Sequence, residues 1–339
     1  THVQIKPTIA SYSAQTRAAM NAYLDSRVLD AIARIAQSPA SASALDRATR
    51  DELIAMHVLW EQEGLIRLDT SVFLQEDIER INAAASQFGA ELAALVSEAA
   101  AALRHEPPAI TNFIVGIMGI GQSLGSALRS AGVAVDWKSY SGKYSQGKVD
   151  FDEVCDAHAA LGPDLQNKSV LRGARYTAVF IGPGGRGYWL DSQGSAYVDQ
   201  INAFLTDAYP MLITGQLDSA PLRAAAEQAG LFRGGKPDAC VVTGETALRY
   251  IPVLRRVGDI TRSYFADKLA SICDLLASTT CGRQGVPAGN MMMNLWRYIR
   301  RGVAREMYAR GLFTDNVPEA GLITLFYENG IRELDELLG

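Results

Sequence analysis

The stretch from Tyr176 to Asp218 constrains the fold of this chain more than any other part of the sequence. A short apolar run, Tyr176–Ile181, leads directly into a glycine cluster made of Gly182, Gly184, Gly185 and Gly187. A second apolar run over residues 211–217 ends at Asp218. This is the pattern of a βαβ nucleotide-binding unit, in which glycines let the backbone approach a ligand and the acid accepts hydrogen bonds from a ribose. The gap from Gly187 to Asp218 is longer than the roughly 20 residues of the compact fingerprint, so a glycine turn kept for packing is the alternative.

Apolar runs and helical periodicity alternate through the second half of the chain. The candidate strands cover residues 176–181, 211–217 and 238–243, and the candidate helices between them cover 195–208 and 220–230. This alternation predicts a parallel, doubly wound α/β sheet with right-handed crossovers. Two later helices, at 260–278 and 288–310, and a late strand at 321–327 complete the expected elements.

The first half of the chain is expected to be mostly helical. Apolar periodicity predicts helices over 16–37 and 76–104, and a capping box at Thr49–Glu52 begins another helix that ends at Gly64. Residues 65–74 alternate around a polar turn and are predicted to form a hairpin, so this region has a winged-helix pattern. The remaining elements are an apolar helix at 112–131, a polar loop at 136–148 and a helix at 151–161.

Charge and residue spacing argue against several classes of protein. The net charge is −5, with 32 basic and 37 acidic residues, and the presumed recognition helix with its wing is net acidic. We therefore predict no nucleic-acid partner, and a winged-helix DNA-binding regulator is the least favoured alternative. The opening residues lack the regions of a signal peptide and no window is apolar enough to span a membrane, so the expected location is cytoplasmic. The scattered cysteines and histidines predict no metal site.

Three local segments carry a resemblance to a known family. They are Ala208-Tyr-Pro-Met-Leu, Leu217-Asp-Ser-Ala-Pro-Leu222 and the late helix Ala304–Phe313. With the winged-helix-like start, their order resembles the class I S-adenosylmethionine-dependent small-molecule O-methyltransferases that carry an N-terminal winged-helix dimerisation domain. The resemblance implies a Rossmann-like fold and an enzyme of secondary metabolism, or natural-product biosynthesis.

The same resemblance implies three parts of the chain and a bound cofactor. Residues 1–106 would form a helical winged-helix dimerisation domain, 107–174 a helical linker that contributes to the substrate pocket, and 175–339 the methyltransferase-type catalytic domain. The glycine cluster and Asp218 would bind S-adenosylmethionine, and the N-terminal domain would form a homodimer or a heteromer. A small molecule would be the substrate.

The chain departs from the family where the catalytic base is expected. The family's cofactor loop usually begins with an acid, but here that position is apolar, and the family's histidine base is missing. Glu245, just past a strand end, is our first candidate base and Tyr250 the second. By position in the family, the segment Asn290-Met-Met-Met-Asn294 would line the substrate pocket through Asn290, Met292 and Met293, with core packing as the alternative for the methionines.

These departures also suit a different reaction on the same fold. Without cofactor use, Arg186 at the glycine loop would stabilise an anionic leaving group, assisted by Lys236 or Arg249. Intramolecular ring closure with loss of sulfate or phosphate, as in aziridine formation, is such a reaction. In that case a carboxylate takes the amine proton, and S-adenosylmethionine is not used.

Overall fold

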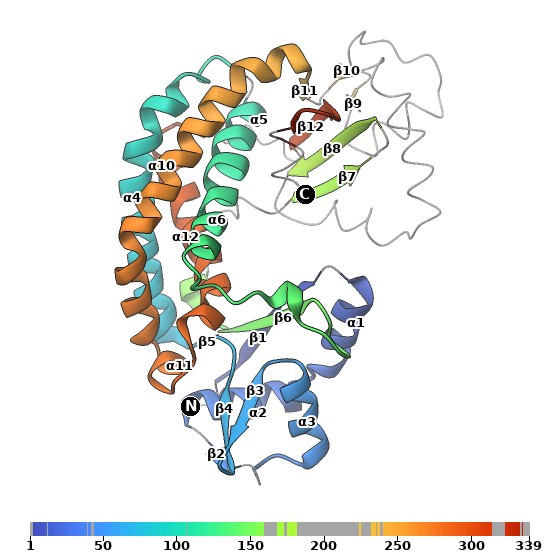
Figure 1. The fold of residues 1–339 in the computed structure, drawn as a ribbon, viewed down its shortest axis with the longest axis vertical. Helices are drawn as coiled ribbons and strands as arrows, with labels where there is room; N and C mark the ends of the chain where they lie inside the picture. Colours follow the sequence, from blue (N-terminus) through green and yellow to red (C-terminus); the bar gives the residue numbers. More distant parts are fainter. Residues whose placement is uncertain are drawn as a thin grey trace. The chain divides into compact units, whose positions relative to one another are not determined.

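The chain has a mixed α/β fold that is rich in helices (Figure 1). The computed structural model describes residues 3–11, 13–38, 40–41, 44–106, 108–158, 168–172, 175–181, 224, 232–234, 236–237, 240–313, 323–332 and 334. Its contacts define two compact units. The first contains Thr1–Phe88, Leu124–Gly162 and Ser263–Gly302, and the second contains Gly89–Ser123, Pro163–Arg262 and Val303–Gly339. The division at residues 106 and 174 stays a prediction, because long parts of 159–239 lie outside the described residues.

A three-stranded sheet in the first unit has β6 (Gly147–Glu153) at its centre. β1 (Ile5–Ser11) pairs with β6 in antiparallel register, and β5 (Val72–Phe73) pairs with it in parallel register. The first six residues of β6 are buried. The predicted polar loop is thus two residues shorter than expected, since β6 begins at Gly147. The helix predicted from 151 was wrong over the described residues, because charged side chains occupy the alternating positions of a buried strand.

The helical N-terminal segment contains two helices rather than the single predicted one. α1 (Ala14–Tyr23) and α2 (Ser26–Gln37) are separated at Leu24 and Asp25. The Asp25 carboxylate accepts a hydrogen bond from the backbone N–H of Val28 at 2.9 Å, so Asp25 is the N-cap of α2. An N-cap aspartate inside an alanine-rich run marked this break in the sequence.

A second small sheet follows α2 and has the order β2-β4-β3. Its strands are β2 (Ala40–Ser41), β3 (Leu59–Gln62) and β4 (Leu65–Leu68), and α3 (Arg47–Ala55) lies between β2 and β3 in the chain. Figure 1 shows the β3–β4 hairpin beside α2 and α3. Glu63 and Gly64 have φ values of 54° and 77°, as a two-residue type I′ hairpin turn requires. The prediction of a hairpin over 65–74 was therefore wrong. β4 forms its hairpin with β3, whereas β5 pairs with β6 in the other sheet.

The helix predicted to continue to Gly64 ends instead at Ala55. His57 adopts a left-handed conformation with φ 56°, and the N–H of Val58 bonds back to the carbonyl of Leu53 at 2.9 Å. Glycine usually occupies such a position. With histidine there, the sequence contained no visible stop signal.

Three long helices pass through the fold. α4 (Gln75–Ala101) and α12 (Ala288–Ala309) confirm their predictions, and α10 (Gly244–Ala277) confirms its own but begins earlier than residue 260. In the first unit, Gly302 lets α12 approach α4 closely. A Cβ atom placed on Gly302 would lie 2.4 Å from the carbonyl oxygen of Ala85.

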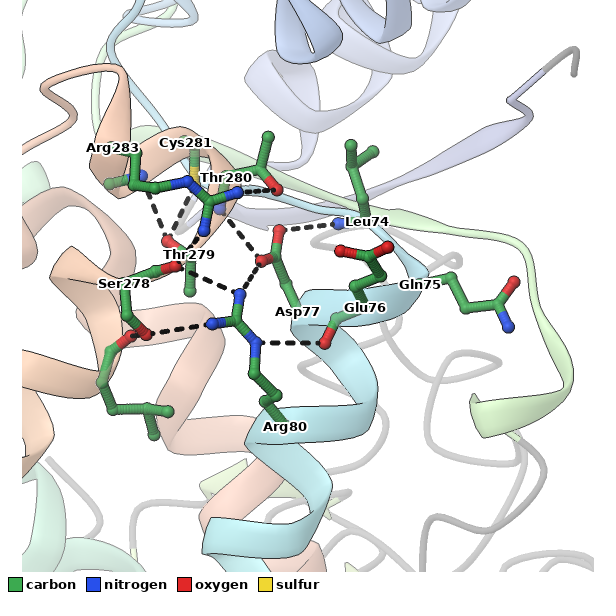
Figure 2. A network of polar contacts seen from close by, with 12 residues as sticks. Leu74, Gln75, Glu76, Asp77, Arg80, Ser278, Thr279, Thr280, Cys281 and Arg283 are labelled. Carbon is green, nitrogen blue, oxygen red and sulfur yellow. Dashed lines mark hydrogen bonds and ion pairs between the residues drawn. The ribbon is translucent and has the colours of Figure 1, made fainter.

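The start of α4 is tied to the turn between α10 and the short helix α11 (Thr280–Arg283) (Figure 2). The buried carboxylate of Asp77 accepts hydrogen bonds from the N–H of Leu74 at 3.2 Å, the N–H of Thr280 at 2.9 Å and Arg80 Nη2 at 2.8 Å. Arg80 Nη2 also donates to the carbonyl of Ser278 at 3.1 Å. This buried acid is fully occupied by its partners and is structural.

The helix predicted over 112–131 is a run of three segments: α5 (Pro108–Thr111), the π-helical η2 (Asn112–Gln122) and α6 (Ser123–Ser130). In the second unit, a Cβ on Gly119 would lie 2.6 Å from Val257 Cγ1, so this glycine permits close helix packing. Two short 3₁₀ helices, η3 (Trp137–Ser139) and η4 (Asp156–His158), flank β6 in the chain.

The sheet of the second unit has the order β11-β12-β8-β7. Its strands are β7 (Lys168–Arg172), β8 (Tyr176–Ile181), β11 (Cys240–Val242) and β12 (Ile323–Glu328), and β9 (Phe232–Arg233) pairs separately with β10 (Lys236–Pro237). Strands predicted at 176–181, 238–243 and 321–327 are confirmed. Within the described strands β11 and β12 are parallel, whereas β12–β8 and β8–β7 are antiparallel, so a doubly wound parallel sheet is not confirmed. The predicted strand 211–217 and, apart from residue 224, the helices 195–208 and 220–230 lie outside the described residues.

Candidate functional site: a buried polar cluster between β6 and α12

The predicted cofactor loop is not among the residues that the structure describes. Gly182, Gly184, Gly185, Arg186 and Gly187 all lie in the gap after β8. Asp218 also lies outside the described residues. Their roles therefore stay predictions.

The two candidate bases lie in the first turns of α10, in different surroundings. Glu245 is exposed, whereas the Tyr250 side chain is buried and its hydroxyl donates to Glu106 Oε2 at 2.8 Å. Arg249 forms an ion pair with Glu106 at 3.2 Å. The Tyr250 hydroxyl thus already donates a hydrogen bond to a carboxylate, which favours a structural role for Tyr250.

The strand register separates the end of β11, which precedes Glu245, from the end of β8. Val242 at the end of β11 aligns with Tyr327 and, through it, with Thr177 near the start of β8. Ile181 at the end of β8 aligns with Ile323. The distance from Ile323 to Tyr327 along β12 is about 13 Å, at about 3.3 Å per residue. β8 and β11 therefore finish at opposite ends of the sheet.

The three predicted substrate-pocket residues divide into one polar contact and two core residues. Asn290 Nδ2 donates to the carbonyl oxygen and to Oδ1 of Asp69, at 2.7 and 2.8 Å. Met292 is buried and Met293 is half-buried in α12. Asn290 lies beside a polar cluster, and the methionines are better explained by packing.

That cluster begins with β6, whose sequence Lys-Val-Asp-Phe-Asp places three ionisable side chains on one face. Lys148, Asp150 and Asp152 alternate with Val149 and Phe151 and are 3%, 0% and 5% exposed. Lysine and aspartate are rarely this buried unless they are paired. The partners come from α12 and from the residues before β5.

α12 contributes a polar stripe to the same interior. Asn290, Asn294, Arg297 and Tyr298 recur at the spacing of one helix face. We call the following residues the β6–α12 cluster: Lys148, Asp150, Asp152, Asn294, Arg297 and Tyr298. All of them belong to the first unit.

Lys148 and Asp150 form a buried ion pair at the centre of this cluster. Lys148 Nζ contacts Asp150 Oδ1 and donates to Thr70 Oγ1 at 3.0 Å. Asp150 Oδ1 also accepts from Ser71 Oγ at 2.8 Å. Burial lowers the pKa of Lys148, and the charge of Asp150 opposes this shift.

Asp152 is held by neutral donors from α12. Its Oδ1 accepts from the Tyr298 hydroxyl at 2.8 Å and from Asn294 Nδ2 at 3.1 Å. Burial raises the pKa of Asp152, and burial with the nearby Asp152 charge raises the pKa of Tyr298. The proton on the Tyr298 hydroxyl is therefore firmly held.

Two buried atoms in and beside the cluster have no hydrogen-bond partner. Asp150 Oδ2 is one, although Arg297 Nη1 lies 3.4 Å away, and Nε2 of His158 is the other. Burial lowers the pKa of His158. An unsatisfied buried polar atom costs about 1–3 kcal/mol, so folding alone does not explain why they are kept.

A half-buried group of side chains lies next to the Lys148 end. The Tyr140 ring stacks on the strained His57 with centroids 3.8 Å apart and planes 19° apart. Burial and the charges of Asp69 and Asp150 raise the pKa of Tyr140 to about 12. Burial also raises the pKa of Asp69. Perturbed ionisable groups concentrated in this way are typical of functional sites.

The predicted pocket segment 290–294 places Asn290 beside this cluster and ends at one of its members, Asn294, but the other five members were not predicted. The signal was present as alternation in residues 147–153, but we expect charged alternating positions to face solvent, not a helix. Among the described residues, no set of three histidine, cysteine or acidic side chains is placed to hold a metal ion.

Comparisons with family models, curated proteins and solved structures found no match. The geometry of the cluster is therefore the basis for assigning a function.

No helix in the described ranges is both long enough and apolar enough to cross a bilayer.

Proposed function

We propose that the chain is an enzyme that acts on a small molecule of secondary metabolism, by S-adenosylmethionine-dependent methyl transfer. The observation that carries the enzymatic part is the burial of Lys148, Asp150 and Asp152 on one face of β6. Taking charges out of water is expensive, and apolar residues would fill this interior at lower cost. Retention of a costly polar interior with perturbed pKa values favours a catalytic role.

The cluster holds one side chain with the properties of a general base, the kind of group that removes a proton from an O–H or N–H. Burial lowers the pKa of Lys148, which is the direction that favours a general base. Asp150 and Thr70 then hold the ammonium that forms. Lys148 therefore joins Glu245, which is exposed in the first turn of α10, as a candidate base.

The N-terminal elements support the winged-helix part of the proposal. α2, β2, α3 and the β3–β4 hairpin follow one another in the chain, with β4 central in the small sheet. We propose that this region forms the dimer interface. Sedimentation velocity should then give a dimer or a stable heteromer, and a stable monomer across the accessible concentrations would contradict this part.

The cofactor part rests on Gly182–Gly187 and Asp218. Calorimetric titration with S-adenosylmethionine and S-adenosylhomocysteine tests it, with Asp218→Ala as the variant and Asp259→Ala, an exposed acid, as the matched control. We expect micromolar binding that Asp218→Ala abolishes and Asp259→Ala retains. A folded protein that binds neither compound would contradict methyl transfer.

We propose ring closure without the cofactor as a second candidate, which the apolar residue in place of the family's acid and the missing family histidine would suit. In this reaction an amine nitrogen attacks carbon, the carbon–oxygen bond to sulfate or phosphate breaks, and the anion leaves. A carboxylate takes the amine proton, and Arg186 stabilises the departing charge. A null titration with S-adenosylmethionine would favour this candidate.

A further inference from the structure

We propose that Arg297 is an oxyanion-binding residue that holds a carboxylate or phosphate group of a small molecule at the β6–α12 cluster. The inference deepens the proposed function, on which it rests for the presence of a small-molecule site. It concerns a residue that neither the methyl-transfer scheme nor the ring-closure scheme uses.

Among the described residues, the protein contacts of the Arg297 guanidinium are made by one nitrogen, Nη1. Arg297 Nη1 lies 3.4 Å from Asp150 Oδ2 and 3.4 Å from Asn294 Oδ1. Both distances are long for charge-assisted hydrogen bonds, which are usually about 2.7–2.9 Å. Asp150 Oδ2 remains without a hydrogen bond. The protein therefore orients this side chain without occupying it.

The remaining donors of Arg297 are free to meet a ligand. Within the described ranges, Nε and Nη2 of Arg297 donate to no protein acceptor. Both atoms remain accessible to solvent, and the side chain as a whole is 17% exposed. An arginine presents its Nε and Nη2 donors as a planar fork.

The charges around Arg297 leave it able to attract an anion. Asp150 is the carboxylate nearest to the guanidinium, but it is shared with Lys148. Asp152 accepts hydrogen bonds from the neutral Tyr298 and Asn294 and none from Arg297. Among the described residues, the guanidinium therefore has no carboxylate that it does not share with another cation.

The geometry selects the class of ligand group. A planar fork of parallel N–H donors matches the two oxygens of a carboxylate or of a phosphate, whereas a lysine supplies only a point charge. The partly exposed position at a polar interior suits one anionic group on a small molecule. A carboxylate and a phosphate share this chemistry, and titration with each distinguishes them.

Calorimetric titration of the full chain with inorganic phosphate and with acetate, at constant ionic strength in chloride buffer, tests the proposal. We expect saturable binding of at least one anion, and the anion that binds identifies the preferred group. Arg297→Lys keeps a charge beside Asp150 and should weaken this binding at least about tenfold, because the fork is lost. Arg297→Gln should abolish it.

Arg256→Lys is the matched control, since Arg256 is an exposed arginine paired with Glu98, and it should bind as the unaltered chain does. Equal binding by Arg297→Lys and the unaltered chain, or saturation by neither anion, would overturn the proposal. The S-adenosylmethionine titration separates this outcome from failure of the proposed function. If Arg297→Lys binds the cofactor normally while the unaltered chain binds no oxyanion, only the oxyanion site is wrong.

Discussion

At the scale of single residues, the Lys148–Asp150 pair shows that this fold buries charged side chains at a cost in free energy. The Lys148–Asp150 pair lies where neighbouring strands and helices bury apolar side chains, and its contacts are made by Thr70 and Ser71 from before β5. Removing one partner of such a pair leaves the other charge buried without compensation. This asymmetry makes single substitutions informative.

Asp150→Ala should lower the free energy of unfolding by about 3–5 kcal/mol, because Lys148 would stay buried without its carboxylate. Urea denaturation measures this difference. Glu98→Ala, which removes an exposed partner of Arg256, should change stability by less than about 0.5 kcal/mol. Equal small effects from the two substitutions would mean that the Lys148–Asp150 pair is solvated.

Asp69 gives a pH-dependent prediction. Burial raises its pKa above the ordinary value of 3.8, so the folded state binds this proton more tightly than the unfolded chain does. The contribution of Asp69 to stability is therefore fully present below pH 3.8 and is lost as pH rises through the raised pKa. Asp69→Asn keeps an oxygen for Asn290 and stays neutral.

Asp69→Asn should therefore be more stable than the unaltered chain at neutral pH, and the difference should vanish below pH 3.8. Unfolding curves at the two pH values provide the measurement. A variant that is less stable at neutral pH would show that the Asp69 charge has a stabilising partner.

At the scale of elements, strongly periodic segments were predictable and charged or uncapped ones were not. α4, α12, β8 and β12 followed from apolar periodicity. β6 was missed because its alternation consists of lysine and aspartate, and the end of α3 was missed because His57 stands where glycine usually would. Tertiary contacts decide such cases, and the local sequence does not record them.

Close helix approach at Gly302 gives a test at this scale. A Cβ there would lie 2.4 Å from the Ala85 carbonyl oxygen, and backbone cannot yield easily. Gly302→Ala should cost about 1–3 kcal/mol, measured by thermal or urea unfolding. Gly244→Ala is the control, since nothing lies within 4 Å of its Cβ position. The idea fails if Gly302→Ala is as well tolerated as the control.

The charges of α3 predict no salt-dependent DNA binding. Arg47 and Arg50 are already paired, with Asp51 at 3.5 Å and with Glu61 at 3.3 Å, and Glu52 contacts Lys143. The helix thus has little free positive charge for phosphates. A gel shift with genomic fragments at low salt should show no retardation. Retardation that weakens as salt rises would restore the regulator hypothesis.

For the molecule as a whole, a division of the sequence into consecutive segments could not predict which stretches form each compact unit. Each unit takes three separate stretches of sequence, and Ile5 pairs with Glu153 across most of the first half of the chain. The polar site depends on this long-range pairing, because β6, β5 and α12 come together only in the fold. The family resemblance pointed to the segment from Asn290 to Asn294, of which only Asn294 belongs to the cluster. The other five cluster residues were not predicted from the sequence.

The central claim is that the β6–α12 cluster is retained for function and not for stability. The most direct measurement is the free energy of unfolding of the triple variant Lys148→Met, Asp150→Leu, Arg297→Met, compared with the unaltered chain by urea denaturation. Replacing Arg297 and the Lys148–Asp150 pair together by apolar residues should be neutral or stabilising by about 1–4 kcal/mol. A loss of stability as large as that of Asp150→Ala alone would contradict the claim and assign the cluster to the folding of the protein.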